Sequence, residues 1–368
     1  MKKSKVFFID FHTSSKENMY AKLTKLLEKA GMFNIDFSKK LVAIKIHFGE
    51  PGNLSYIRPN YAAVVVKKIK DKDGLVFLTD SNTLYKGRRS NAVDHLESAH
   101  ENGFNPLAVG CNVVIADGLK GTDCREIEIG LNHCKIAKIG AAIADADVII
   151  SMNHFKGHEF ACIGGCLKNL GMGSGSVGGK LEMHSNSKPL INAENCTACK
   201  ICERNCAHDA IHICGNGKKL AVIDYDKCVG CGQCVAVCQY DGAQVQWEAA
   251  NMQEKIAEYA YAVLKDKPAF HINFLMDISP NCDCWNANDV PIVPNIGILA
   301  SSDPVAIDRA SIDLVNKAPV NKNSVLETIQ INGNDKFMSV HPHTDWRISL
   351  NYAEKIGLGS QEYELVEM

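Results

Sequence analysis

The sequence lacks an excess of charge of either sign. Its 40 Lys and Arg residues nearly balance its 42 Asp and Glu residues, and the formal net charge at pH 7 is -2. Because nucleic-acid binding depends on a field of positive charge, nucleic acid is not an expected partner. Intrinsic disorder is not expected either, since 46% of the 368 residues are hydrophobic and this share can build a large core. The length predicts about two domains.

Long hydrophobic runs are also missing. The longest, residues 141–152, is interrupted by two aspartates and is shorter than the roughly 20 residues of a transmembrane helix. The first residues carry three lysines before a short apolar stretch that ends at Asp10, which is not the pattern of a signal peptide. The cysteines show no framework of a small secreted protein, so we expect a soluble protein of the reducing cytoplasm, without a membrane partner.

Cysteine, in contrast, is abundant, and eight of the 16 cysteines form two runs of identical spacing: Cys196-x2-Cys199-x2-Cys202-x3-Cys206 and Cys228-x2-Cys231-x2-Cys234-x3-Cys238. This spacing is typical of bacterial ferredoxins with two [4Fe-4S] clusters. Three cysteines of a run reach three corners of one cluster, and the fourth lies too far along the chain and binds the neighbouring cluster. We therefore predict one cluster on Cys196, Cys199, Cys202 and Cys238, and another on Cys228, Cys231, Cys234 and Cys206.

Two structural zinc sites are the alternative for these cysteines. Four-cysteine zinc sites usually consist of two C-x2-C pairs separated by a longer loop, so the tandem runs favour iron-sulfur clusters. The resemblance to bacterial ferredoxins covers about residues 188–245. Ala207 and Gln239 stand where those ferredoxins usually have a proline after the fourth cysteine, and this difference loosens the turns without removing a ligand.

Strands and helices alternate on both sides of the cysteine runs. The pattern predicts strands at 5–10, 41–48, 75–79, 113–116, 148–152, 269–274 and 296–299, and helices at 16–30, 61–70, 91–102, 136–144, 252–264, 304–315 and 346–356. Such alternation is typical of an α/β fold with a mostly parallel sheet and helices on both faces. We expect residues 1–187 and 246–368 to form the two parts of one α/β domain, and residues 188–245 to be an inserted ferredoxin-like α+β domain.

A glycine-rich stretch, residues 164–180, precedes the cysteine runs and is expected to be irregular. Residues 173–178 match the dinucleotide-binding pattern G-x-G-x-x-G, but no predicted strand precedes them, so we reject a nicotinamide site. A Walker loop is rejected too, because the required first glycine is missing. Two interpretations remain: a flexible loop whose amides, with Lys168 and Lys180, bind an anion, or a turn against which the inserted domain docks.

Polar residues follow several predicted strands: His47, then Asp80 and Arg88, then His154, Lys156 and His158. Ligands of parallel sheets bind outside the carboxyl ends of the strands, so these residues predict a substrate site. His154 and His158 are four residues apart, but Gly157 disfavours a helix, and a loop is expected. Each histidine alone fits a role in holding the loop by hydrogen bonds, whereas the adjacent Lys156 favours an active-site role for both.

Several short motifs give the chain a resemblance to a protein family, the domain of unknown function 362, whose members often carry a ferredoxin module. They are His-Phe-Gly-Glu at 47–50, Asp-Ser-Asn at 80–82, His-Phe-Lys-Gly-His at 154–158, Gly-Gly at 164–165, Lys-Asn-Leu-Gly-Met-Gly at 168–173, Met-His at 183–184, Cys-Asp-Cys at 282–284 and Ser-Asp-Pro-Val-Ala-Ile-Asp at 302–308. The resemblance covers nearly the whole chain. It implies the fold and the cluster content and leaves the reaction open.

Cys282 and Cys284 are separated by one residue and follow the predicted strand at 269–274. Such pairs bind metals or exchange disulfides. Together with His154 and His158 they would complete a tetrahedral site for a soft metal. The alternative is that the pair only closes a loop that two nearby prolines already restrict.

The charged residues of 188–242 balance, six of each sign, unlike those of a strongly acidic soluble carrier. We therefore expect a redox enzyme whose clusters pass single electrons to an anionic small-molecule substrate or an unidentified cofactor. The catalytic candidates are His154, Lys156 and His158, and the substrate-binding candidates are His47, Asp80, Arg88, Lys168, Lys180 and His184. The alternative is a non-enzymatic electron carrier or metal-handling accessory protein, and both need a redox partner protein or low-potential donor.

Overall fold

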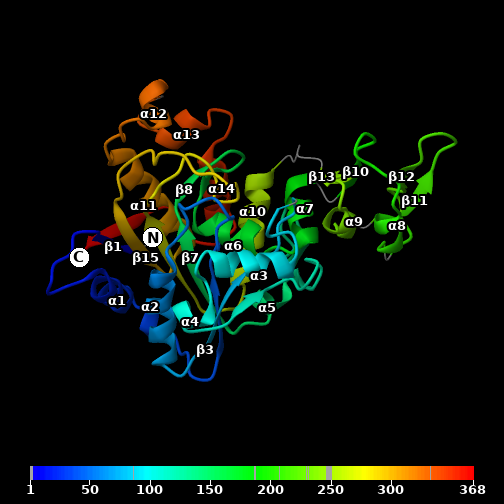
Figure 1. Cartoon of the computed structure of the whole chain (residues 1–368). Helices are drawn as coiled ribbons and strands as arrows, with labels where there is room; N and C mark the ends of the chain where they lie inside the picture. The colour runs from blue at the N-terminus through cyan, green and yellow to red at the C-terminus, as the bar shows by residue number, and fades with distance from the viewer. Residues whose placement is uncertain are drawn as a thin grey trace.

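A mostly parallel sheet lies at the centre of the molecule (Figure 1). The computed structural model describes residues 3–85, 87–185, 188–206, 208–228, 230, 232–245, 251–331 and 333–368. The strand order is β16-β1-β15-β14-β7-β2-β3-β4. Within the described residues, β15 runs against the direction of the other strands of this sheet. The strands are β1 (Ser4–Asp10), β2 (Leu41–Lys45), β3 (Leu75–Asp80), β4 (Val113–Ile115), β7 (Val148–His154), β14 (Ala269–Leu275), β15 (Gly297–Ser301) and β16 (Tyr363–Glu367).

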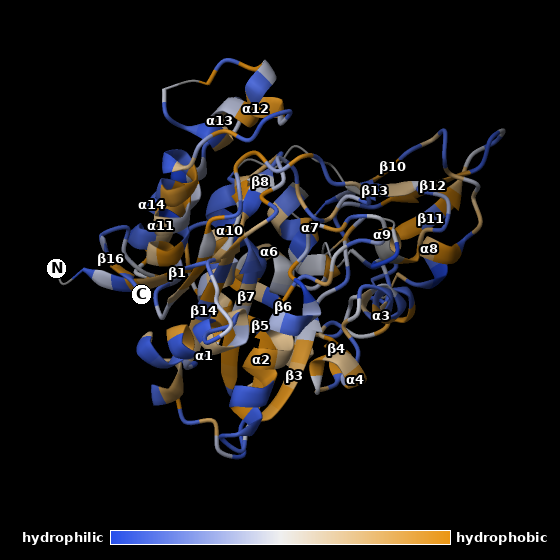
Figure 2. Ribbon diagram, turned by 60° about the vertical axis from the view of Figure 1, so that its left-hand side comes forward, coloured by the Kyte–Doolittle hydropathy of each residue, from blue (hydrophilic) through white to orange (hydrophobic). Residues whose placement is uncertain are grey.

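The sheet is buried on both faces, which confirms the expected α/β class. In β7, Val148 and Ile150 lie in one hydrophobic cluster and Ile149 lies in the other, because successive side chains of a strand point to opposite faces. Figure 2 shows strands of the sheet such as β3 mostly in the hydrophobic colour, while helices such as α2 and α14 carry both hydrophilic and hydrophobic residues. One cluster contains residues of α1 (Met19–Lys29), η1 (Met32–Asn34), α2 (Pro59–Lys70), α3 (Ala92–Glu101) and α4 (Pro106–Val109).

The second cluster is formed mainly with later parts of the chain. It contains residues of α5 (Ala141–Ala144), α6 (Cys166–Ser174), α10 (Met252–Leu264), α11 (Pro304–Lys317), α12 (Val325–Thr328), α13 (Lys336–Val340) and α14 (Trp346–Lys355). Side-chain caps begin several of these helices. Asp303, for example, accepts hydrogen bonds from the amides of Val305 and Ala306, which satisfies donors that the first turn of α11 leaves unpaired. No helix in the described part of the chain is long and apolar enough to cross a bilayer.

The helix expected at 136–144 is wrong over most of its length. Residues 136–140 form β6 (Ile136–Gly140), which pairs with β5 (Cys124–Glu128), and the helix α5 begins at Ala141. Ala137 and Ile139 are buried while Ile136 is exposed, which is the two-residue period of a strand. The apolar residues also fit a helix, and only the pairing with β5 decides between the two.

The glycine-rich stretch at 164–180 is largely helical, so the expectation of a flexible loop is wrong. It forms α6 and the start of α7 (Val177–Ser185). A Cβ atom on Gly171 would lie 2.1 Å from the carbonyl oxygen of Ile256 in α10, and one on Gly179 would lie 2.6 Å from that of Lys138. These glycines therefore allow close packing of two helices against their neighbours.

Between α7 and α10 the chain leaves the sheet and forms a cysteine-rich segment, residues 188–245, at one side of the molecule (Figure 1). Its elements are β10 (Pro189–Ile191), α8 (Ile201–Arg204), β11 (Ile211–Cys214), β12 (Leu220–Ile223), α9 (Gln233–Val237) and β13 (Ala243–Val245). β10 pairs with β13, and β11 pairs with β12, both antiparallel. Val177 and Leu181 of α7 share a hydrophobic cluster with Cys202 and Cys234, so α7 joins this segment to the sheet.

Candidate functional site

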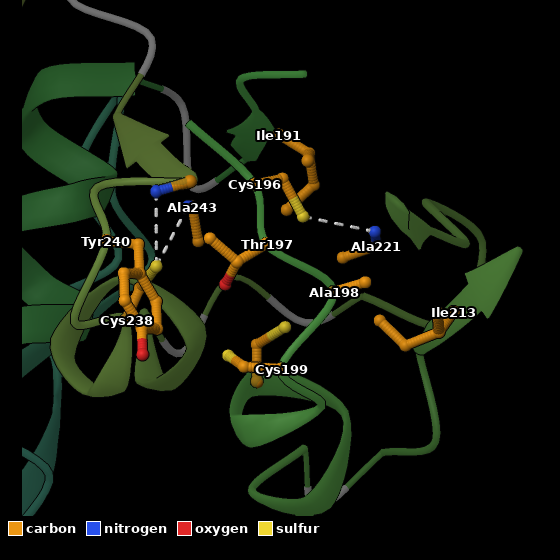
Figure 3. A pocket seen from close by; sticks show the side chains of 12 residues that line it. Ile191, Cys196, Thr197, Ala198, Cys199, Ile213, Ala221, Cys238, Tyr240 and Ala243 are labelled. Carbon is orange, nitrogen blue, oxygen red and sulfur yellow. Dashed lines mark hydrogen bonds between the residues drawn. The ribbon is translucent and has the colours of Figure 1, made fainter. Parts of the chain in front are cut away.

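Four predicted cluster ligands line one cavity in the cysteine-rich segment. Cys196, Cys199, Cys202 and Cys238 surround it, and in Figure 3 the sulfur atoms of Cys196, Cys199 and Cys238 face this space. The rest of the lining is mostly apolar and includes Ile191, Thr197, Ala198, Ile213, Ala221, Tyr240, Gly242 and Ala243.

Backbone amides point at the sulfur atoms of this cavity. Ala221 donates to Cys196 Sγ at 3.4 Å, and Gly242 and Ala243 donate to Cys238 Sγ at 3.2 and 3.3 Å. Burial raises the pKa of Cys202, and the nearby thiols of Cys238, Cys199 and Cys196 raise it further. Four thiolates at one place repel one another, so this donor set fits a positively charged metal centre.

A second cavity lies between the two runs. It is lined by Cys206, Cys228 and Cys234 together with Pro189, His208, Ala210, Ile211, Gly230, Gly232 and Gln233. The amide of Ala210 donates to Cys206 Sγ at 3.3 Å. Cys231, which the spacing also assigns to this group, lies outside the described residues. In both cavities the fourth cysteine of one run lies with the first cysteines of the other run, which is the grouping that the spacing predicts.

A buried ion pair lies where β2 and β3 end. The ammonium group of Lys45 is 2.8 Å from a carboxylate oxygen of Asp80 and donates to Asn169 Oδ1 at 2.7 Å. Burial would raise the pKa of Asp80, but Lys45, His47, His95 and Arg89 hold it well below its usual value. The carboxylate of Asp80 is therefore ionised and tied to the protein.

The guanidinium of Arg89 occupies the centre of a second polar group. It donates to Glu50 Oε2 at 2.6 Å and to the hydroxyl of Tyr85 at 2.8 Å, and it lies 2.9 Å from His47 Nε2. Burial, together with the positive charge of Arg89, lowers the pKa of His47 well below its usual value. Burial also raises the pKa of Tyr85 to about 12, so His47 and Tyr85 are neutral.

Arg88, the predicted substrate ligand, lies outside this group. Its side chain is 42% exposed and pairs with Glu101 at 2.7 Å and Glu97 at 3.6 Å on α3. Its amide donates to Glu50 Oε1 at 2.9 Å, which turns the side chain outward and the next one, Arg89, inward. The structure therefore assigns to Arg89 the position that the sequence analysis gave to Arg88.

His154 and Lys156 share one carboxylate. His154 Nδ1 lies 2.8 and 2.9 Å from the two oxygens of Asp283, and Lys156 Nζ lies 3.2 Å from one of them. His154 Nε2 lies 2.8 Å from the carbonyl oxygen of Met276. Both ring nitrogens of His154 therefore lie within hydrogen-bond distance of an oxygen acceptor. Burial would raise the pKa of Asp283, but His154 and Lys156 hold it well below its usual value.

His158 lies on a short hairpin of β8 (Lys156–His158) and β9 (Cys162–Gly164), where a loop was expected. Its Nδ1 accepts hydrogen bonds from the amides of Phe160 and Ala161, both at 3.1 Å. Burial, with nearby positive charge from Lys168 and Lys156, lowers its pKa well below the usual value. His158 is therefore a neutral ring whose Nε2 carries the proton.

Cys282 and Cys284 form a disulfide. A ring nitrogen of His158 and the two sulfurs lie within 4.8 Å of one another, and Lys168 Nζ donates to Cys282 Sγ at 3.4 Å. Burial, together with the positive charge of Lys156, lowers the pKa of Lys168 to about 7. His154 does not join this group because both of its nitrogens contact other atoms, so the structure does not assemble the expected two-Cys, two-His metal site.

α7 brings Lys180 and His184 to the same region. Burial lowers the pKa of Lys180 to about 8 and that of His184 to about 3. The charge of Lys180 acts on Asp117, whose pKa burial raises to about 6. Asp117 Oδ1 accepts from the amide and the side chain of Asn82, while its Oδ2 has no hydrogen-bond partner within the described residues.

The structure thus brings His47, Asp80, Lys156, His158, Lys168, Lys180 and His184 to one end of the sheet; we call this group, with its partners, the strand-end site. The sequence analysis did not select Lys45, Arg89, Asp117 and Asp283 as site residues. Lys45 could have been selected because it is a charged residue at the end of an otherwise apolar strand. For Asp283 the signal was its place between two cysteines.

Comparisons with known proteins give one partial relative. A protein of Halobacterium salinarum described as an iron-sulfur subunit of dimethyl sulfoxide reductase is 32% identical over 74 residues, which is 20% of this chain and 26% of that protein. The chain thus spans about a quarter of the length of this relative.

Two solved structures resemble the fold distantly. The lactate racemase apoprotein from Thermoanaerobacterium thermosaccharolyticum has a TM-score of 0.39 at 13% identity, over 74% of this chain and 51% of that one. A Thermotoga maritima protein from a structural genomics consortium has a TM-score of 0.41 at 10% identity, over 81% and 58%. A family model matches far more directly, over residues 42–313, and this chain therefore belongs to the family described as domain of unknown function DUF362.

Proposed function

We propose that the protein is an iron-sulfur redox enzyme. It would hold two [4Fe-4S] clusters in an inserted ferredoxin-like domain, residues 188–245, and deliver single electrons to an anionic small molecule or unidentified cofactor at the strand-end site. The observation that carries this proposal is the grouping of Cys196, Cys199, Cys202 and Cys238 around one cavity, and of Cys206 with Cys228 and Cys234 around another.

The surroundings of the cysteines fit iron-sulfur clusters. Amides of Ala221, Gly242, Ala243 and Ala210 donate to cysteine sulfurs, and such hydrogen bonds tune the reduction potential of bound clusters. The partial relative described as an iron-sulfur subunit also supports this interpretation. A bound [4Fe-4S] cluster supplies one electron at a time, and a redox partner protein or low-potential donor would provide these electrons.

α7 connects the second cavity with the strand-end site. A Cβ on Gly232, which lines that cavity, would lie 3.0 Å from a methyl group of Val177 at the start of α7. Lys180 and His184 follow on the same helix, and the rise of 1.5 Å per residue puts His184 roughly 10 Å beyond Val177. This separation favours delivery of electrons within one chain.

The charges of the strand-end site favour an anionic substrate. Lys45 and Arg89 are paired with Asp80 and Glu50, and Asp283 is shared by His154 and Lys156. Lys168 contacts the sulfur of Cys282, and burial lowers the pKa of Lys168 to about 7 and that of Lys180 to about 8. A carboxylate or phosphate bound beside these two lysines would favour their charged forms.

Lysines fit the role of proton donor better than the two histidines predicted for it. The pKa of Lys168 is about 7 and that of Lys180 about 8, and a general acid works best when its pKa is near the working pH. His158 is neutral at that pH, and both nitrogens of His154 are held by Asp283 and Met276. Among the predicted catalytic residues, Lys156 and His158 would then position the substrate.

Cys206→Ala tests the cluster part of the proposal. Cys206 belongs to the first run but lines the second cavity, so the variant should lose mainly the cluster of the second run, and iron should fall from about eight to about four per chain. Electron paramagnetic resonance of the dithionite-reduced protein would follow each cluster. Loss confined to the cluster on Cys196, Cys199 and Cys202 would refute the crosswise grouping.

Turnover with dithionite or reduced ferredoxin across a panel of anionic metabolites tests the substrate part. Lys156→Ala, His158→Ala and Lys168→Ala should keep their iron, because none lines a cysteine cavity, and should lose binding or reduction of the substrate. Arg88→Ala is the matched control, since its side chain lies on the surface. Equal turnover in the Lys168 variant and this control would refute the site.

A further inference from the structure

The disulfide between Cys282 and Cys284 is a chemical group at the strand-end site that the proposed function does not use. Cys282 is 2% exposed, and Cys284 is partly exposed. The carbonyl oxygen of Cys284 accepts a hydrogen bond from Tyr85 at 3.4 Å, so the pair lies beside the Arg89 group. Asp283, between the two cysteines, binds His154 and Lys156.

A structural role explains this disulfide poorly. It closes a loop with one intervening residue, and so short a loop removes little entropy from the unfolded chain. The segment is already held by other bonds: Gly157 donates to the carbonyl of Ser279 at 2.9 Å, and His341 lies 2.7 Å from the carbonyl of Pro280. Glu159 also accepts from Trp285 Nε1 at 2.9 Å.

The surroundings of Cys282 instead favour the reduced form of its sulfur. Lys168 Nζ lies 3.4 Å from Cys282 Sγ, and the amide of Cys284 donates to the same sulfur at 3.4 Å. An ammonium group and an amide at this distance stabilise a thiolate, which makes a cysteine redox-active. The charge of Lys168 lowers the pKa of His184 on α7, so the helix that contacts the second cysteine cavity lies near the lysine that contacts Cys282.

We propose that Cys282 and Cys284 form a two-electron redox centre, which is reduced from disulfide to dithiol by electrons from the two [4Fe-4S] clusters and is reoxidised by an anionic two-electron acceptor. The proposal rests on the proposed function. In the reduction the S–S bond breaks, two electrons enter, and two protons form two thiols, or one proton forms the Cys284 thiol while the Cys282 thiolate pairs with protonated Lys168. Two clusters that each carry one electron match this requirement. In the reoxidation the S–S bond forms again, and the two electrons and two protons pass to the acceptor.

A metal bound by His158, Cys282 and Cys284 is the competing explanation. The tautomer of His158 argues against it, because Nδ1 accepts two amide hydrogen bonds and Nε2 then carries a proton instead of a lone pair. The disulfide also leaves no thiolate for a metal.

Counting electrons in the anaerobic holoprotein tests the proposal. Titration with dithionite should take about four electrons per wild-type chain, one for each cluster and two for the disulfide, and about two in the Cys282→Ser, Cys284→Ser double variant. Acid quenching, alkylation and mass spectrometry should find both cysteines closed before titration and open after it. The Lys168→Gln variant should keep the cluster signals and shift the pH profile of the dithiol's reactivity upward.

Three results would overturn the inference: equal electron counts in both proteins, a pair that stays closed when the clusters are reduced, or a pair that is open and metal-bound before titration. A full cluster signal with a closed pair would refute this inference alone. Absence of the cluster signal would refute the proposed function, and with it the source of the electrons.

Discussion

Removal of the Asp283 carboxylate should destabilise the fold markedly. Asp283 is fully buried, and it accepts from His154 at 2.8 and 2.9 Å and from Lys156 at 3.2 Å. The side chains of these two residues are only 1% and 8% exposed. In Asp283→Asn the buried ammonium group of Lys156 loses its negative partner, and the loss of one partner of a buried ion pair costs about 3–5 kcal/mol.

The lower end of this range applies, because asparagine keeps one oxygen that accepts a hydrogen bond. We therefore expect the free energy of unfolding at pH 7 to fall by about 3 kcal/mol. The pKa of Asp283 is lowered in the folded state, so its stabilising effect is present at neutral pH and declines as the pH falls below about 4.

Urea denaturation followed by circular dichroism, under anaerobic conditions, measures this change. Asp289→Asn is the matched control, since Asp289 is exposed on the same loop and should alter stability by less than about 0.5 kcal/mol. If the two variants lose the same small amount of stability, the charge balance described for His154 and Lys156 is incorrect.

Two other predictions concern buried groups. Burial raises the pKa of Asp117 to about 6, so the free energy of unfolding of the wild type should fall as the pH rises from about 4 to 6. Asp117→Asn should be more stable than the wild type at pH 7 by up to about 3 kcal/mol. If urea denaturation gives the same change of unfolding free energy with pH for both proteins, this prediction is wrong. Gly171→Ala should lower the free energy of unfolding by about 1–3 kcal/mol, because the new Cβ would meet the carbonyl oxygen of Ile256. Gly217→Ala is the control, since no atom lies near its Cβ, and it should hardly change the temperature of thermal unfolding.

The strands of the central sheet could be predicted because most of them are short apolar runs between turns. β7 is buried at every position, and such a run is readable without knowledge of its partners. The direction of β15 and the pairing of β5 with β6 depend on contacts between distant residues. Glycine disfavours helices in isolation, and the sequence does not show that Gly171 of α6 allows the close approach of α10.

The sequence predicts where the candidate site lies, but it does not predict which side chains point into it. The rule that ligands bind at strand ends selected His47, Asp80 and Lys156. It could not choose Arg89 over Arg88, because the two are adjacent in the sequence and only the contacts of their side chains with Glu50 and Glu101 distinguish them. The cysteine grouping was predictable because the spacing of the ligands is fixed by the size of a cluster.

Metal and sulfide analysis of the anaerobically purified protein tests the central claim most directly. If each cysteine cavity holds a [4Fe-4S] cluster, the protein should contain about eight iron and eight sulfide per chain, and reduction should give the resonance signals of two clusters. Zinc in place of iron, persisting after anaerobic reconstitution with iron and sulfide, would contradict the claim.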